Sequence, residues 1–356
     1  MLNLEKLKWY NVPNENLDTY GFDDGSGGIS ARIPSAVTKN FDKPLADSAL
    51  FSAGGRIRFS TNSKHIGLKV TYGFKVDNGV ACTMHVCRGF VLYKNEGDID
   101  IPVHIFCPPA DNTDDEYCDT KEIIKNDETY NYTLIFPCLT QVLSCQIGID
   151  KDADLKEGKK YINKKPIIFY GSSITHGLAA SNSGNIYEQF ISRKYNVDYV
   201  NLGFAGNAKG ETSMAEYISK REMCAFVCDY DHNAPDAEHL RKTYPILYET
   251  IRKNHPVIPY IVISKPDYLS LNKAEQASNE ERRSFIEEFY KSHRLDGDEN
   301  IYFIDGSTFF PKQYNLCCTA DLCHPNDLGF SYMSEIIGKV LADALGLKKI
   351  RQSSRG

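Results

Sequence analysis

Ser173 lies in a glycine-containing segment, Gly171-Ser-Ser-Ile-Thr-His-Gly177, directly after the apolar run Pro166–Tyr170. The turn that follows a buried strand can expose a hydroxyl at the edge of a sheet. A base that removes the hydroxyl proton would then make it a nucleophile. The segment matches neither the G-x-S-x-G elbow nor a P-loop. Glycine and serine also form ordinary turns, so this segment by itself indicates only a candidate.

Asp321 and His324 stand three residues apart, directly before the last helical pattern of the chain. An imidazole can accept the proton of a serine hydroxyl, and a carboxylate beside it holds the ring in the required tautomer. The spacing D-x-x-H is common by chance. It becomes specific where the pair follows a strand of the same sheet as the serine.

Two further polar segments follow apolar runs. The segment Asn201–Gly210 contains three glycines, whose backbone N–H groups could approach a ligand closely, although a flexible loop has the same composition. In Asp229–Pro235, the side-chain amide of Asn233 could donate to an oxyanion or cap the next helix.

Strands alternate with helices after residue 165, which predicts a doubly wound parallel sheet with right-handed crossovers. In such sheets functional groups gather at the carboxyl ends of the strands, where the candidate residues stand. The apolar runs predict strands at 166–170, 197–202, 225–228, 260–264 and 301–304. The helical patterns cover 186–195, 214–220, 237–254, 273–293 and 327–345.

The first 150 residues instead contain short β-rich runs separated by turn residues, which favours an all-β sandwich or jelly roll. The runs predict strands at 55–59, 66–72, 82–86, 90–93, 101–106 and 130–136. The acidic stretch 111–128 could be a loop or a poorly patterned hairpin, and a solvated surface loop is the expectation. With a charged joint at 156–165, we expect a β domain over 1–155, an α/β domain over 160–347 and a polar tail over 348–356.

The second half of the chain resembles the SGNH, or GDSL-type, serine hydrolases, because four of their sequence blocks occur in order. Gly171-Ser-Ser-Ile-Thr175 resembles the first block, and Asp321-Leu-Cys-His-Pro325 matches the last. Gly206 and Asn233 match the glycine and asparagine of the two blocks between. Gly89-Phe-Val-Leu-Tyr93 is similar to the G-x-D-L-Y signature of the β domain that precedes a bacterial branch of this family.

The resemblance implies a five-stranded, flavodoxin-like α/β/α sandwich and a carboxylic ester hydrolase that needs no cofactor. Ser173 takes the nucleophile position, with His324 as base and Asp321 as its orienting acid. The oxyanion hole would consist of the N–H groups of Ser173 and Gly206 and the Asn233 amide. Two departures, Ser172 for the usual Asp and Ala234 after Asn233, remove no group with a direct chemical role.

Other polar residues near the strand ends are candidates for a substrate pocket. His176 follows the nucleophile position by three residues and could instead lie on a helix surface. The remaining candidates follow the second, third and fourth strands, and they are Lys209, Asp231, Lys265 and Asp267.

Composition excludes several classes of protein. A net charge of −6 argues against nucleic acid as a partner. No run of about 18 apolar residues predicts a membrane span. The N-terminus lacks the apolar core of a signal peptide, so we expect a cytoplasmic protein. Eleven cysteines without a C-x-x-C spacing indicate reduced thiols rather than a metal site.

The predicted activity is hydrolysis of a small acyl ester, an acetyl ester above all, on a small molecule or an oligosaccharide. The sugar part follows from the family resemblance, since fold does not define substrate. Two alternatives stay open: an acyltransferase that uses the same residues, and a carbohydrate-binding protein with a degenerate hydrolase domain. A homo-oligomer is compatible with the sequence.

Overall fold

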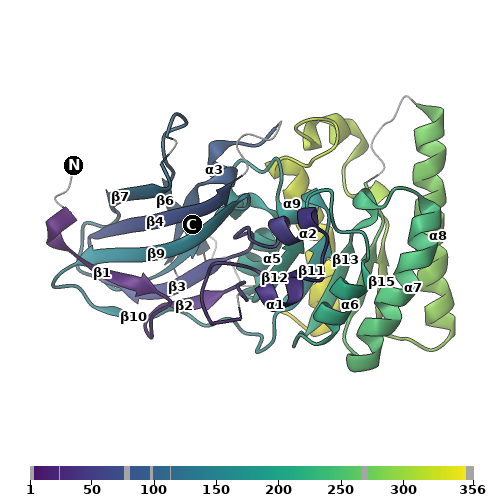
Figure 1. Cartoon of the computed structure of the whole chain (residues 1–356), viewed down its shortest axis with the longest axis horizontal. Helices are drawn as coiled ribbons and strands as arrows, with labels where there is room; N and C mark the ends of the chain where they lie inside the picture. The colour runs from purple at the N-terminus through teal and green to yellow at the C-terminus, as the bar shows by residue number, and fades with distance from the viewer. Residues whose placement is uncertain are drawn as a thin grey trace, which may run out of the picture.

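The computed structural model describes residues 4–23, 25–75, 81–96, 99–112, 114–266 and 272–349. A β-rich N-terminal part occupies one end of the long axis (Figure 1). Helices α7 (Ala237–Asn254) and α8 (Lys273–Leu295) lie at the opposite end.

The N-terminal part consists of two antiparallel sheets. The first has the order β1 (Leu7–Val12), β9 (Thr140–Asp150), β4 (His65–Lys75) and β7 (Glu116–Glu122). The second has the order β10 (Leu155–Glu157), β3 (Arg56–Thr61), β8 (Tyr130–Ile135), β5 (Phe90–Glu96) and β6 (Ile99–Phe106), and β2 (Asp18–Tyr20) pairs with β3. The short helix η1 (Leu4–Lys6) precedes β1, and α1 (Ser35–Thr38), α2 (Lys43–Ser48) and α3 (Met84–Cys87) lie between strands.

Alternating apolar residues bring the two sheets together. On β4, Ile66, Leu68, Val70 and Tyr72 are all buried, as period-2 patterning requires of a strand with one face on a core. They share one hydrophobic cluster with Ile57 and Leu134 of the second sheet. The expected β sandwich is therefore present.

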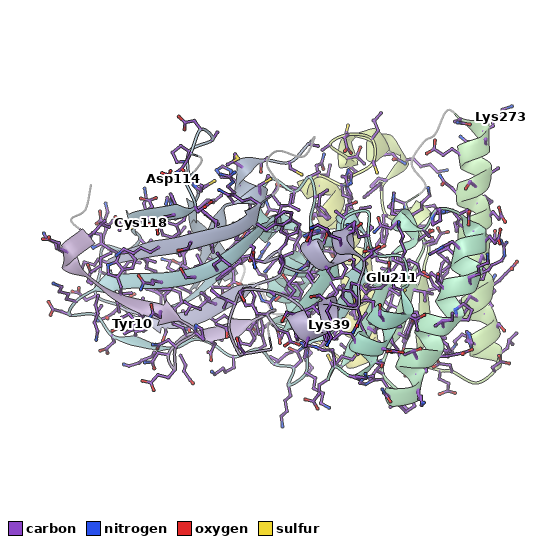
Figure 2. All side chains as sticks on the ribbon, in the orientation of Figure 1. Tyr10, Lys39, Asp114, Cys118, Glu211 and Lys273 are labelled. Carbon is purple, nitrogen blue, oxygen red and sulfur yellow. The ribbon has the colours of Figure 1, made fainter. Side chains whose placement is uncertain are left out.

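Two predictions for this part are wrong. Residues 82–86 form no strand, because Thr83 accepts a hydrogen bond from the Val86 N–H and starts helix α3. The acidic stretch 111–128 is not all loop, since β7 pairs with β4. Polar side chains suit such an edge strand, on which Cys118 is exposed (Figure 2). Strands β1, β2, β9 and β10 were not predicted from the sequence.

The C-terminal part contains the predicted parallel five-stranded sheet, in the order β12-β11-β13-β14-β15. All predicted strands and helices of this part occur, with no end shifted by more than two residues. The strands are β11 (Ile167–Gly171), β12 (Tyr199–Gly203), β13 (Ala225–Asp229), β14 (Tyr260–Ile263) and β15 (Ile301–Ile304). The fold class predicted from the sequence is confirmed.

Helices cover both faces of this sheet (Figure 1). On one face α6 (Thr212–Ser219), α7 and α8 pack against Ile168, Tyr170 and other strand residues of the same orientation. On the other face α5 (Tyr187–Tyr195) and α9 (Asp327–Leu345) pack against Ile167 and Phe169. Shorter helices border the sheet: α4 (Ser173–His176), η2 (Ser183–Asn185), η3 (Asp231–Asn233), η4 (Gly306–Thr308) and η5 (Lys312–Cys318).

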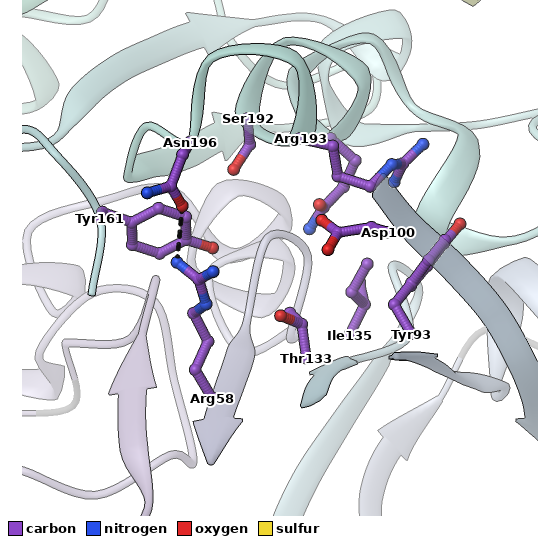
Figure 3. Close-up of a pocket in the computed structure, with 10 residues that line it drawn as sticks. Arg58, Tyr93, Asp100, Thr133, Ile135, Tyr161, Ser192, Arg193 and Asn196 are labelled. Carbon is purple, nitrogen blue, oxygen red and sulfur yellow. Dashed lines mark hydrogen bonds between the residues drawn. The ribbon is translucent and has the colours of Figure 1, made fainter. Parts of the chain in front are cut away.

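The two parts share their hydrophobic clusters. Ile33 and Leu45 of the N-terminal part belong to the cluster of α6 and α7, and Cys138 belongs to that of α5 and α9. A narrow polar pocket lies between the second β sheet and α5, where Arg58 donates to Asn196 over 3.0 Å (Figure 3). It has about 10 Å³ of room for the centre of a water molecule, enough for one water.

Candidate active site

Ser173 is the first residue of α4 and directly follows β11. The Ser172 hydroxyl caps this helix by accepting a hydrogen bond from the Ile174 N–H over 3.2 Å. Residue 171 must be glycine, because a Cβ there would stand 2.1 Å from the Thr175 hydroxyl and 2.6 Å from the Asp229 carbonyl. The tight turn presents the partly exposed Ser173 side chain at the carboxyl edge of the sheet.

Ser173, His324 and Asp321 form a continuous chain of hydrogen bonds. The Ser173 Oγ lies 2.9 Å from His324 Nε2, and His324 Nδ1 lies 2.8 Å from Asp321 Oδ2. Nδ1–H can donate to the carboxylate, which leaves Nε2 as an acceptor for the serine proton. The Ser173 hydroxyl thus meets an imidazole that lies 151 residues later in the sequence and a carboxylate three residues from that imidazole.

The loop of Asp321 is fixed by the carboxylate itself. Asp321 Oδ1 accepts the backbone N–H groups of Cys323 and His324 over 3.1 and 2.7 Å. Leu322, which lies between Asp321 and Cys323, has a φ of 67° and is 69% exposed. Burial raises the pKa of Asp321, but the hydrogen bonds from His324 outweigh it and hold that pKa below its usual value. Asp321 therefore stays charged near neutral pH.

Gly206 lies in the turn after β12, and Asn233, which belongs to η3 after β13, contacts this turn with its side chain. The Asn233 side chain donates to the Phe204 carbonyl over 2.9 Å, and the same carbonyl accepts the Asn207 N–H. Gly206 is exposed, and its φ of 72° favours glycine. A Cβ on Gly206 would meet no atom within 4 Å, so the turn is open on this side.

Buried polar groups hold the turn that carries Ser173 in place through hydrogen bonds. Asp229 ends β13 and accepts the hydroxyls of Thr175 and Tyr187 over 3.1 and 3.4 Å. Burial raises the pKa of Asp229 to about 7. The sequence analysis gave this residue no role, although its place at the end of a buried strand is a signal for one.

Two of the five pocket candidates are structural residues instead. His176 is fully buried, and both its ring nitrogens contact backbone groups: Nε2 lies 2.9 Å from the Cys138 carbonyl, and Nδ1 accepts the Ala205 N–H over 3.3 Å. Asp231 is also fully buried, pairs with Arg282 and accepts the Lys265 N–H over 2.8 Å. A substrate cannot reach either side chain without displacing these partners.

The other three candidates differ in position. Lys265 is half-buried beside Asp231, where burial and the Arg282 charge lower its pKa. Lys209 is exposed, and its carbonyl accepts a hydrogen bond from His239. Asp267 lies outside the described residues.

Residues that the sequence analysis did not consider also border the site. The side chain of His232 interacts electrostatically with Lys265 and His324, and burial lowers its pKa to about 3. Cys82, from the N-terminal part, interacts electrostatically with His324 and Asp321, and a hydrogen bond with Cys87 lowers its pKa to about 6. No local pattern in the sequence connects Cys82 with residues 240 positions away.

The described ranges contain no group of three or more His, Cys, Asp or Glu side chains that could hold a metal ion. The eleven cysteines are all free, and five are buried. None of the helices in the described part of the chain is long and apolar enough to span a membrane.

Serine hydrolases include proteins with a three-layer α/β/α domain in which a serine, a histidine and a carboxylate are aligned at the carboxyl edge of the central sheet. Residues 164–342 match a model of the GDSL-like lipase/acylhydrolase family. Residues 7–155 match a second family model, that of the N-terminus of SGNH-hydro-type esterases. The chain belongs to the GDSL-like lipase/acylhydrolase family, as the sequence blocks predicted.

Solved structures share the architecture of the whole chain. A chain from Bacteroides ovatus, described as a GDSL-like lipase, is 25% identical with a TM-score of 0.85, and the match covers 96% of this chain and 99% of that one. The salicylyl-acyltransferase SsfX3 from a tetracycline biosynthetic pathway is 17% identical with a TM-score of 0.76, covering 97% and 99%. A family two carbohydrate esterase from Cellvibrio japonicus is 11% identical with a TM-score of 0.60, covering 96% and 98%. The latter two show a common fold. None of the curated proteins matches the chain.

Proposed function

We propose that this protein is a serine esterase that cleaves a small acyl ester through a Ser173–His324–Asp321 triad. The observation that carries the proposal is the continuous hydrogen-bonded chain, 2.9 Å from Ser173 Oγ to His324 Nε2 and 2.8 Å from His324 Nδ1 to Asp321 Oδ2. These are the distances at which an imidazole can accept a serine proton and a carboxylate can orient the ring.

In the proposed reaction, Ser173 attacks the ester carbonyl carbon while His324 takes its proton. The carbonyl oxygen becomes negative, and the N–H groups of Ser173 and Gly206 with the Asn233 amide stabilise that charge. Each such donor contributes about 3 kcal/mol to lowering the barrier. His324 returns the proton to the leaving alcohol, and water activated by the same imidazole then releases the acid from Ser173.

The proposed substrate is an acetyl ester on a sugar or a related small molecule. This part of the proposal rests on the family and on carbohydrate esterases among the proteins of similar fold. The mechanism itself requires only an ester and water, so a screen has to identify the alcohol and the acyl group.

The first experiment combines labelling with turnover. An organofluorophosphonate reacts with an activated serine, so mass spectrometry should locate the adduct on Ser173 and find none in Ser173→Ala. Hydrolysis of p-nitrophenyl acetate and of acetylated sugars, measured as released acid with a chelator present, should depend on the same residue. If the protein shows no labelling and no turnover, the result favours the carbohydrate-binding alternative.

A second experiment separates hydrolase from acyltransferase. Products are analysed by mass spectrometry with and without an excess of a sugar or alcohol acceptor. Free acid as the main product in both reactions supports the esterase. Transfer to the acceptor at the expense of free acid contradicts it and favours the acyltransferase.

A further inference from the structure

The turn that carries Gly206 is held by groups from outside its own strand. Arg32, fully buried in the N-terminal part, donates from Nη1 to the carbonyls of Asn201 and Gly203 over 3.0 and 2.9 Å. The Asn207 side chain donates to Ser48 Oγ over 3.2 Å. Both ends of the turn therefore contact residues that come more than 150 positions earlier in the chain.

His176 contacts the residue that directly precedes Gly206. Its Nδ1 accepts the N–H of Ala205, the residue before Gly206, over 3.3 Å. Its Nε2 lies 2.9 Å from the carbonyl of Cys138 in the N-terminal part, and Phe51 packs against the ring with 5.6 Å between ring centroids. A carbonyl can only accept, and an N–H can only donate. These partners therefore require a neutral His176 that carries its proton on Nε2.

Burial and the Arg32 charge keep His176 in that neutral form, because both lower its pKa well below the usual value. A second proton, on Nδ1, would point at the Ala205 N–H, and two donors cannot form a hydrogen bond, so this contact would be lost. The contact is therefore maintained at neutral pH and in the mildly acidic range.

We propose that His176 is a positioning residue that aims the Gly206 N–H at the oxyanion, with the Cys138 carbonyl of the N-terminal part as its fixed support. The proposal rests on the function proposed above, since an oxyanion forms only in ester chemistry. It gives the N-terminal part a role in turnover besides covering apolar surface. Oxyanion donors act only when aimed at the position of the charge in the transition state.

The expected effect is on kcat rather than on KM. The oxyanion exists in the transition state and not in the bound ester, so a misdirected donor slows the chemical step and leaves substrate binding nearly unchanged. Complete loss of one donor lowers kcat by about 10²–10³-fold. A turn that loses one hydrogen bond should lower it by about 10–100-fold.

The test compares three variants of the full chain. His176→Leu removes both hydrogen bonds at similar volume and should lower kcat, raise KM less than about twofold, and weaken inhibition by a boronic acid, which forms a tetrahedral adduct on the serine. His176→Gln offers one acceptor and a donor and should restore most of kcat. His255→Leu is the matched control, because it removes a histidine–carbonyl bond to Ser219 of 3.0 Å outside the site.

Folding is monitored separately. Titration with the fluorophosphonate gives the fraction of active sites, and kcat is expressed per active site. If His176→Leu lowers only that fraction, while kcat per site and boronate inhibition match the His255→Leu control, the positioning role is wrong and His176 is merely structural. An equal kcat loss in His176→Gln and His176→Leu also contradicts it.

Hydrogen exchange distinguishes this inference from the proposed function. His176→Leu should accelerate amide exchange of the peptide that contains Ala205, measured by mass spectrometry, whether or not any ester is hydrolysed. If the wild type neither turns over esters nor reacts with the fluorophosphonate, the proposed function fails. Unchanged exchange in an active protein means that the His176 inference alone fails.

Discussion

Ser172 and Ser173 are adjacent hydroxyls with different surroundings. Ser172 is fully buried and caps α4, whereas Ser173 is partly exposed and lies 2.9 Å from His324. We expect Ser173→Ala to lower kcat by about 10³-fold or more with the fold intact. Ser172→Ala should cost about 1 kcal/mol of stability through the lost cap and keep appreciable turnover. Kinetics and thermal unfolding of both variants check this. An essential Ser172 with a dispensable Ser173 would contradict the assignment.

Asp321 provides the second prediction at the residue scale. Its pKa lies below the usual value, so it remains charged at neutral and mildly acidic pH. The proposed base must be unprotonated to accept the serine proton, so activity should fall on the acid side. Asp321→Asn loses the charge partner and favours the wrong tautomer, which can lower kcat by up to about 10⁴-fold.

The measurement is a set of pH–rate profiles for the wild type and Asp321→Asn, with a chelator in every reaction. His324→Ala should be at least as damaging as Asp321→Asn. A requirement for an added divalent metal ion, or near-wild-type turnover in His324→Ala, would be incompatible with the triad.

At the scale of elements, β13 ends on a carboxyl that titrates near neutral pH. Burial raises the pKa of Asp229 to about 7, whereas an unfolded aspartate titrates near 4. Between these values the folded protein keeps a proton that the unfolded chain has released, so stability falls as the pH rises from about 4 to 7. Above about pH 7 this contribution no longer changes.

Asp229→Asn cannot titrate, and its amide oxygen can still accept the Thr175 hydroxyl. We expect the variant to gain stability relative to the wild type as the pH rises through this window, by about 4 kcal/mol at most. Urea unfolding of both proteins at several pH values measures the difference. A difference that is independent of pH would refute the raised pKa.

The strands that are buried on both faces were predicted accurately from the sequence, whereas the strands of the β sandwich were predicted less accurately. The five residues of each of β11, β12 and β13 are all buried, and runs of mainly apolar residues identify these strands. In the β sandwich, β7 lies at an edge with an exposed acidic pattern. Its pairing with β4 depends on the neighbour that the fold supplies, which no local pattern records.

At the scale of the whole molecule, the N-terminal part covers and supports the α/β part. A chain shortened to begin at Lys159 would uncover the surface that packs against Ile33 and Leu45 and remove Arg32 from two carbonyls. Each buried carbonyl left without a partner costs about 1–3 kcal/mol, and exposed apolar surface promotes association. We therefore expect low soluble yield and reduced kcat.

Soluble yield, size-exclusion chromatography and kinetics on the best substrate test this expectation. The full chain, purified in parallel, is the control. A soluble shortened chain with unchanged kcat and KM would show that the N-terminal part contributes neither stability nor geometry to the site.

The sequence by itself determined the order of the elements in the α/β part and the three residues that meet at its edge. Ser173, Asp321 and His324 each stand in a short segment next to a strand or helix with strong periodicity. A parallel sheet gathers the carboxyl ends of its strands at one edge, so position along the chain predicts proximity. Their catalytic roles stay a prediction that the experiments above test.

The tertiary structure decided which polar residues near that edge face the site. His176 and Asp231 are polar residues at sequence positions typical of pocket residues, but both are fully buried. His176 contacts a backbone carbonyl, and Asp231 forms an ion pair. Arg32 and Cys82 reach the site from the N-terminal part. Burial and partner choice depend on segments that are distant in sequence, and packing between such segments leaves no trace in a local pattern of residues.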